Sequence, residues 1–131
     1  MLKFNNVNVN PKEHRTGDCS TRAIVSTLGI TYEQALKEQC EMAIKYCYGI
    51  TCKETTTKVL EKYGWVKMKQ PKKPNGKKYL VGEIDLVVTK QELENGVLIS
   101  MANHDTCAKG KNIIDIWDCR NKTIGNYWIK K

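Results

Sequence analysis

The sequence lacks the features that would assign its 131 residues to a membrane or secreted class. No apolar run approaches the roughly 20 residues that a membrane-spanning helix needs. The first residues, MLKFNNVNVNPKEH, lack the apolar core of a secretory signal peptide. We therefore expect a cytoplasmic protein that does not enter a membrane.

No C-x-x-C pair occurs among the six cysteines, although that spacing is common in metal sites. Cys47 and Cys52 are spaced C-x4-C and Cys40 lies seven residues before Cys47, so a zinc-binding module built from these three is an alternative. Cys40 and Cys47 also lie two turns apart on one face of a predicted helix, which favours core packing. Without a signal peptide we expect free thiols, with no metal and no cofactor.

Acidic residues are scarce relative to basic ones, at 14 against 22, which gives a formal net charge of +8. Such an excess favours an acidic partner, either a nucleic acid or an acidic protein surface, although a solvated lysine-rich surface explains it as well. The densest cluster, KMKQPKKPNGKK at 67–78, contains two prolines and a glycine and is typical of an exposed loop or hairpin tip. Because no basic groove is interleaved with aromatic residues, nucleic acid is not the favoured partner.

The length is sufficient for one domain, 1–131, and the pattern along it predicts helices first and an antiparallel sheet second. Residues 1–15 are expected to form an extended arm. In the second predicted helix, Thr31 and Gln34 form a capping box, and a stripe of Ala35, Leu36, Cys40, Ala43, Ile44 and Cys47 is expected to be buried. The predicted helices are 18–28, 31–49, 53–64 and 89–96. The predicted strands are 65–69, 97–103 and 124–130. A hairpin is predicted at 104–118, and residues 79–88 are predicted to form a strand or a loop. This order is an α+β fold.

The segment TGDCSTRAIVSTLG places one cysteine at the start of a helix. Asp18 is a favourable N-cap residue and Gly29 a favourable stop, so Cys19 is expected in the first turn. Unpaired N–H groups and the helix dipole lower the pKa of a thiol there. Cys19 is therefore a candidate nucleophile, against the alternative that it is a small buried apolar residue.

Only two histidines are present, and one of them, His104, directly follows a predicted buried strand. Asp115 lies eleven residues further on, followed by Trp117 and Asp118. A histidine beside a thiolate would hold the proton and later deliver it to a leaving group, and a carboxylate on the adjacent strand would orient the imidazole. The chain order therefore predicts a cysteine–histidine–acid site.

The segment GDCSTRAI, followed by H-x10-D-x-W-D and a terminal YW strand, resembles papain-like cysteine peptidases. More narrowly, it is similar to small phage- and prophage-encoded members related to bacteriocin-processing peptidases. The resemblance covers almost the whole chain and implies a papain-like fold with Cys19 as nucleophile, His104 as general base and Asp115 as orienting residue. It also implies that Trp117 shields the contact between His104 and Asp115 from water.

One position departs from the family pattern. Papain relatives place a glutamine six residues before the cysteine as an oxyanion donor, whereas this chain has Glu13, which has no donor when ionised. The oxyanion hole would then use the Cys19 backbone N–H together with a second group, for which Asn10 and His14 are candidates.

The choice of orienting acid depends on the hairpin register. A two-residue turn at Lys109–Gly110 pairs 104 with 115 and favours Asp115. A three-residue turn at 109–111 pairs 104 with 116 and places Asp118 on the face of the histidine. Asp115 is the first choice and Asp118 the alternative.

These observations predict a thiol hydrolase that cleaves an amide or isopeptide bond of a protein or peptide substrate. The net charge favours an acidic substrate, and the resemblance implies that the protein is phage-encoded. Transamidation and deamidation use the same triad. The alternative is a catalytically idle papain-like scaffold that binds an acidic host protein or a nucleic acid. Glu13 in place of the family's glutamine favours this alternative.

Overall fold

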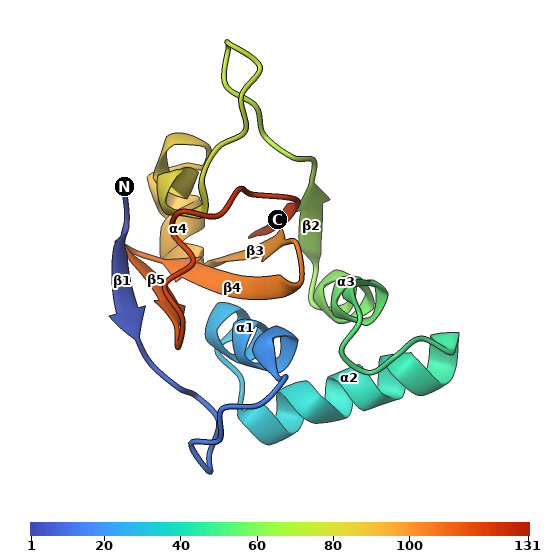
Figure 1. Cartoon of the computed structure of the whole chain (residues 1–131). Coiled ribbons are helices and arrows are strands. Elements are labelled where there is room, and N and C mark those ends of the chain that lie inside the picture. Colours follow the sequence, from blue (N-terminus) through green and yellow to red (C-terminus); the bar gives the residue numbers. More distant parts are fainter.

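The computed structural model describes residues 1–131 as a six-stranded sheet with helical segments on both faces (Figure 1). The chain contributes one edge strand first, then three helices, and then the other five strands, with η1 and α4 between the first and second of these. The elements in chain order are β1 (Lys3–Asn6), α1 (Cys19–Leu28), α2 (Tyr32–Tyr46), α3 (Lys53–Lys62), β2 (Trp65–Met68), the 3₁₀ helix η1 (Val81–Leu86), α4 (Lys90–Asn95), β3 (Val97–Met101), β4 (His104–Lys109), β5 (Asn112–Asp115) and β6 (Tyr127–Lys130). The expected α+β class is confirmed.

The sheet is mixed, so the expectation of a wholly antiparallel sheet is wrong at one edge. Its strand order is β1-β5-β4-β3-β6-β2, and β1 runs parallel to β5, with Lys3 opposite Asn112 and Asn6 opposite Asp115. The other neighbouring strands are antiparallel. The N-terminal arm joins the sheet through backbone hydrogen bonds, which need no particular side-chain pattern and therefore left no signal in the sequence.

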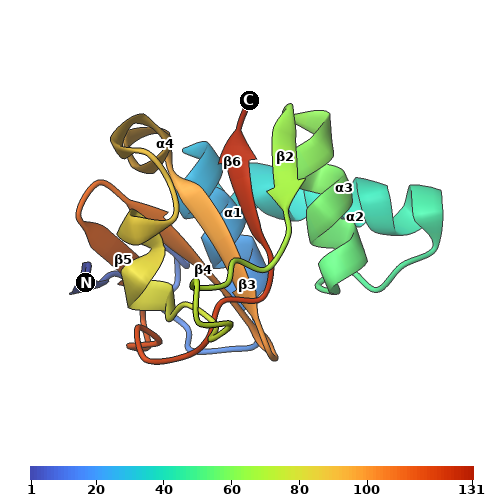
Figure 2. The same ribbon diagram turned by 90° about the horizontal axis from the view of Figure 1, so that it is seen from above.

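Both faces of the central strands are covered, which explains why every residue of β3 is buried. Leu98 packs into a cluster with α1, α2 and α3, whereas Val97 and Ile99 pack into a larger cluster with η1 and α4. Successive side chains of a strand point to opposite faces, so β3 serves both clusters. Figure 2 shows α4 and η1 on the opposite side of the sheet from α1.

The buried face of α2 differs from the predicted stripe. Ala35 and Ala43 are buried as expected, but Ile44 is 79% exposed and Leu36 and Cys47 are exposed as well. The face that packs on α1 carries Gln39 instead, whose side-chain amide accepts from the Thr21 hydroxyl (2.6 Å) and donates to Ser20 (3.1 Å). The side of α2 that faces α1 is therefore defined by hydrogen bonds to polar residues of α1 together with the buried Ala35 and Ala43.

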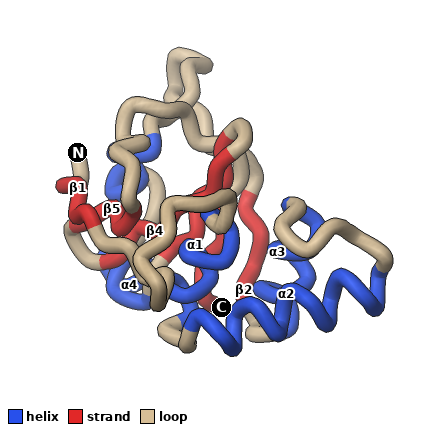
Figure 3. Tube along the Cα trace, turned by 60° about the horizontal axis from the view of Figure 1, so that its bottom comes forward, coloured by secondary structure: helices blue, strands red, loops and turns tan.

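The second helix also ends earlier than predicted. Thr31 caps α2 by accepting from the Gln34 backbone N–H, but the Gln34 side chain donates to Glu38 and does not complete the predicted capping box. The helix stops at Tyr46, with Cys47 in the left-handed conformation (φ 58°), rather than at Gly49. Figure 3 shows α2 at the periphery of the molecule, where its main contacts are with α1 and α3.

The remaining predictions agree with the structure more closely. Gly29 ends α1 in the left-handed conformation, and Thr89 with Glu92 forms the expected capping box of α4. The lysine-rich segment 67–78 forms a hairpin tip, closed by a bridge between Lys72 and Lys78. Residues 81–86, for which a strand or loop was predicted, form η1. No helix has the length and apolar character required to cross a membrane.

Candidate active site

Cys19 is the first residue of α1 and is partly exposed. Asp18, which precedes it, does not cap the helix with its side chain; that carboxylate is bonded elsewhere. Burial raises the pKa of the Cys19 thiol, but contact with the His104 side chain and a hydrogen bond from the Asp105 backbone outweigh this effect, so the pKa is lowered overall. A thiol in this environment is enriched in the reactive thiolate form.

His104 is the first residue of β4, and its ring lies between the Cys19 thiol and the Asp115 carboxylate. Nε2 lies 2.6 Å from Oδ2 of Asp115, so Nδ1 is the nitrogen left to serve Cys19. Burial lowers the pKa of His104, but the hydrogen bond to Asp115 and contacts with Cys119 and Cys19 raise it by more. The imidazolium is therefore favoured, and it faces a thiolate on one side and a carboxylate on the other.

Asp115 ends β5 and is buried, with a side chain that is 1% exposed. Its Oδ1 accepts from the Ile116 backbone N–H (2.7 Å) and from Nη1 of Arg22 (2.9 Å), while Oδ2 faces His104. Burial raises the pKa of this carboxyl, but the hydrogen bond and charge of His104 outweigh burial, helped by Arg22, and hold the pKa below its ordinary value. The acid is therefore ionised and oriented by three donors.

The hairpin turn lies one residue later than either predicted turn. Lys109 pairs with Asn112, so the two loop residues are Gly110 and Lys111. Continued along the strands, this register brings Asp115 opposite Thr106, two residues from His104 on the same face. A diagonal pair on one face is within reach of long side chains, so Asp115 meets His104 although the predicted direct pairing was wrong.

The other predicted site residues fall in different places. Trp117 packs edge-on against His104, with ring centroids 4.9 Å apart and an interplanar angle of 87°. Asp118 does not approach the imidazole; its carboxylate is paired with Arg120 on the surface (2.8 Å). The choice of Asp115 over Asp118 agrees with this geometry.

The two side chains predicted as candidate oxyanion donors, those of Asn10 and His14, are placed less favourably than the other predicted site residues. The side-chain nitrogen of Asn10 donates to Oδ2 of Asp18 (3.0 Å), so Asn10 supports Asp18 in the loop before α1. Glu13 and His14 are exposed, and Glu13 has a left-handed backbone (φ 56°). The first-turn N–H groups of α1, that of Cys19 among them, lack acceptors within the helix and are therefore candidate oxyanion donors.

Two residues of this site were missed at the sequence level. Arg22 donates from Nε to Oδ1 of Asp18 (2.8 Å) and from Nη1 to Asp115. The hydroxyl of Tyr32 donates to Oδ2 of Asp18 (2.9 Å). The spacing of Asp18 and Arg22, four residues apart across a helix start, was a usable signal for the first ion pair, but nothing in the sequence indicated that Arg22 also reaches β5.

One group of potential ligand atoms exists, made of His104, Asp115 and Cys119, whose atoms lie within 4.8 Å of one another. Nε2 of His104 and Oδ2 of Asp115 are hydrogen-bonded to each other, and the buried Cys119 thiol lies 3.8 Å from the same oxygen. We assign this group to the triad and not to a metal. Cys40, Cys47 and Cys52 form no such group, so the structure does not support the zinc alternative.

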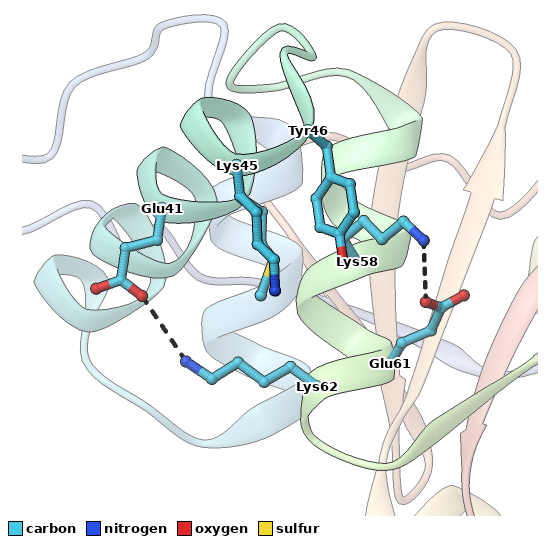
Figure 4. A pocket seen from close by; sticks show the side chains of 7 residues that line it. Glu41, Lys45, Tyr46, Lys58, Glu61 and Lys62 are labelled. Carbon is cyan, nitrogen blue, oxygen red and sulfur yellow. Dashed lines mark ion pairs between the residues drawn. The ribbon is translucent and has the colours of Figure 1, made fainter.

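Two open hollows are lined in part by residues that contact this site: Trp117, which packs on His104, and Asn10 and Tyr32, which bind Asp18. One is lined by Met101, Ala102, Trp117, Lys122 and Thr123, and the other by Asn10, Pro11, Lys12, His14, Thr16 and Tyr32. A larger hollow lies far from this chemistry, between α2 and α3, where Lys58 pairs with Glu61 and Lys62 pairs with Glu41 (Figure 4). Four of its five charged side chains are joined in these two ion pairs, and its size alone does not make it a functional site.

Comparison with known proteins identifies no relative: no family model, no curated protein and no solved structure matches this chain.

Proposed function

We propose that this protein is a papain-like cysteine hydrolase that cleaves an amide or isopeptide bond with Cys19, His104 and Asp115. The observation that carries the proposal is the position of one imidazole ring, which bonds to Asp115 through Nε2 at 2.6 Å and lowers the pKa of the Cys19 thiol from its other side. Thiol catalysis needs a nucleophile, a base within reach of it and a third group that orients the base.

The reaction follows from these positions. The Cys19 thiolate attacks the carbonyl carbon, and N–H groups at the start of α1 stabilise the oxyanion of the tetrahedral intermediate. The C–N bond breaks as the His104 imidazolium protonates the leaving amine, which leaves a Cys19 thioester. His104 then takes a proton from water, whose oxygen displaces the thiolate and releases a carboxylic acid.

The papain-like assignment is supported by the sequence resemblance and by the order of the parts, and a phage origin by the resemblance alone. The nucleophile begins a helix, and the base and the acid follow on adjacent strands that this helix packs against. Trp117 covers the edge of His104, where its apolar ring limits the access of water to the His104–Asp115 hydrogen bond.

A catalytically idle scaffold that binds an acidic partner is the second candidate. The specific observation in its favour is that Glu13, at the position where papain relatives have an oxyanion glutamine, is exposed and bears no donor. The net charge of +8 would then serve binding alone.

The test is alkylation of the native protein with iodoacetamide across a pH series, read thiol by thiol by peptide mass spectrometry. We expect Cys19 to react first near neutral pH, ahead of the more exposed Cys47, because the contact with His104 lowers the pKa of the Cys19 thiol. His104→Gln should slow Cys19 and leave Cys47 unchanged, which makes Cys47 an internal control. If Cys47 or Cys40 reacts first, the nucleophile is misassigned.

A screen of peptide amides separates the hydrolase from the idle scaffold. Turnover that is lost in Cys19→Ser, with an unchanged circular dichroism spectrum, supports hydrolysis. A rapidly alkylated Cys19 without turnover on any peptide, combined with tight binding of an acidic protein, would favour the second candidate.

A further inference from the structure

Arg22 is the one buried cation that connects the nucleophile helix to the acid of the triad. Its side chain is 8% exposed and spans from Asp18, immediately before Cys19, to Asp115 at the end of β5. The contacts use different nitrogens: Nε with Asp18 (2.8 Å) and Nη1 with Asp115 (2.9 Å). A guanidinium has this forked geometry and a lysine does not.

Both ends of this bridge are themselves held in place. Asp18 also accepts from Asn10 (3.0 Å) and from the Tyr32 hydroxyl at the start of α2 (2.9 Å). Asp115 also accepts from the Ile116 backbone N–H. The bridge therefore sets the separation between the first turn of α1, which carries the thiol, and the carboxylate that orients the base.

The bridge also changes the charge that His104 meets. A buried carboxylate beside an imidazole would hold its proton strongly, whereas the reaction requires His104 to release that proton to the leaving amine. Arg22 places a positive charge on the other oxygen of the same carboxylate. Asp115 thus presents an acceptor whose charge is partly compensated, which is closer to a neutral amide than to a free carboxylate.

We propose that Arg22 is a positioning residue of this site, which joins the nucleophile helix to the orienting acid and compensates the charge of Asp115 so that His104 can exchange its proton. The role in proton exchange rests on the proposed hydrolase function. The groups that surround His104 are Cys19 and Arg22 of α1, Asp115 of β5, Cys119 of the loop after β5, and the adjacent Asp105, which lies near Lys53 of α3 (3.8 Å).

The test is an NMR titration of the His104 ring in a Cys19→Ser background, which removes the coupled titration of the thiol. Arg22→Gln should move the titration midpoint of His104 up by about one pH unit, because Asp115 loses its compensating charge. Asp115→Asn should move it down, and the double variant Arg22→Gln/Asp115→Asn should return it toward the parent. A residue that only stabilised the fold would not produce these opposite shifts.

The matched control is Arg120→Gln, which removes another ion-paired arginine from the surface near Trp117. It should leave the midpoint unchanged. An Arg22→Gln midpoint that stays at the parent value, or falls, overturns the proposal. If Arg22→Gln does not fold, the comparison of Asp115→Asn with the double variant decides, since the double variant must have the higher midpoint.

Arg22→Lys separates positioning from charge. It keeps the positive charge but cannot fork between the two carboxylates, so the His104 midpoint should be unchanged while alkylation of Cys19 in the native background slows several-fold. A full alkylation rate in this variant would overturn the positioning role. These titrations do not depend on turnover, so the role of Arg22 and the proposed function can fail separately. Unmoved His104 midpoints with Cys19 still the most reactive thiol would overturn only the role of Arg22. Midpoints that move as expected, with another thiol more reactive than Cys19, would overturn only the assignment of the nucleophile.

Discussion

Two regions of this molecule use ion pairs in opposite ways. At the junction of α1, β4 and β5, the pair of Arg22 and Asp115 has side chains that are 8% and 1% exposed. On α2, the pair of Lys37 and Glu33 has side chains that are 63% and 80% exposed. The same chemistry therefore orients buried groups and shifts pKa values in the first region, whereas in the second it is largely screened by water.

The burial of apolar side chains also differs between these two regions. Ile24 of α1 is fully buried against the sheet, while Ile44 of α2 is 79% exposed. Six of the ten exposed large apolar side chains lie on or beside α2 and α3: Leu36, Ile44, Tyr46, Tyr48, Ile50 and Tyr63. The junction is thus the tightly specified part of the fold, and the outer helix pair is the more permissive part.

The largest expected effect tests the buried pair. Asp115→Ala should reduce the free energy of unfolding by about 3 kcal/mol, because it leaves the Arg22 nitrogen and the His104 ring without their acceptor. Urea denaturation measures this loss. Asp118→Ala is the matched control, since Asp118 is also paired with an arginine but on the surface, and little change is expected. Equal losses in the two variants would remove the contrast.

The second effect compares two isoleucines in helices. Ile24→Ala should cost about 3 kcal/mol through lost burial and the cavity left behind. Ile44→Ala should stay within about 0.5 kcal/mol, because the side chain is already in water. Thermal or urea denaturation of both variants under one set of conditions gives the comparison. A large loss in Ile44→Ala would show that α2 is covered in solution.

The third effect is a pH dependence that only the junction should show. The pKa of His104 is raised in the folded protein, so its contribution to stability is complete below the ordinary value of 6.5 and is lost as the pH rises through the folded value. Asp115 acts in the other direction: its pKa is lowered, so its contribution is lost as the pH falls below 3.8. Urea denaturation of Cys19→Ser between neutral and alkaline pH should therefore show falling stability. The same curve should be flatter in Cys19→Ser/His104→Gln.

The smallest effect tests the exposed pair. Lys37→Gln should change the free energy of unfolding by no more than about 0.5 kcal/mol, and the change should vanish in high salt. Denaturation at low and high ionic strength measures it. A loss as large as that of Asp115→Ala would mean that exposure does not separate the two regions.

Prediction from sequence succeeded where neighbours along the chain decide the structure. Gly29 ends α1 and Thr89 with Glu92 begins α4 as expected, and α1 starts directly after Asp18 although the Asp18 side chain does not cap it. Prediction from sequence failed for the apolar stripe of α2, because the buried Gln39 is hydrogen-bonded to Thr21 and Ser20, which lie 18 and 19 residues earlier in the chain. The parallel pairing of β1 with β5 was missed for the same reason, since the partner strand lies more than a hundred residues away.

The sequence by itself determined where Cys19 stands in its helix, that β3 is buried, and that a histidine and an acid follow on adjacent strands, because caps and alternation act over a few residues. Only the tertiary structure decided which oxygen of Asp115 serves His104 and that Arg22 takes the other. The hairpin register that brings Asp115 within reach depends on a turn one residue from its predicted position. These choices arise from packing between distant segments, whose hydrogen bonds form only when the sheet and α1 are brought together.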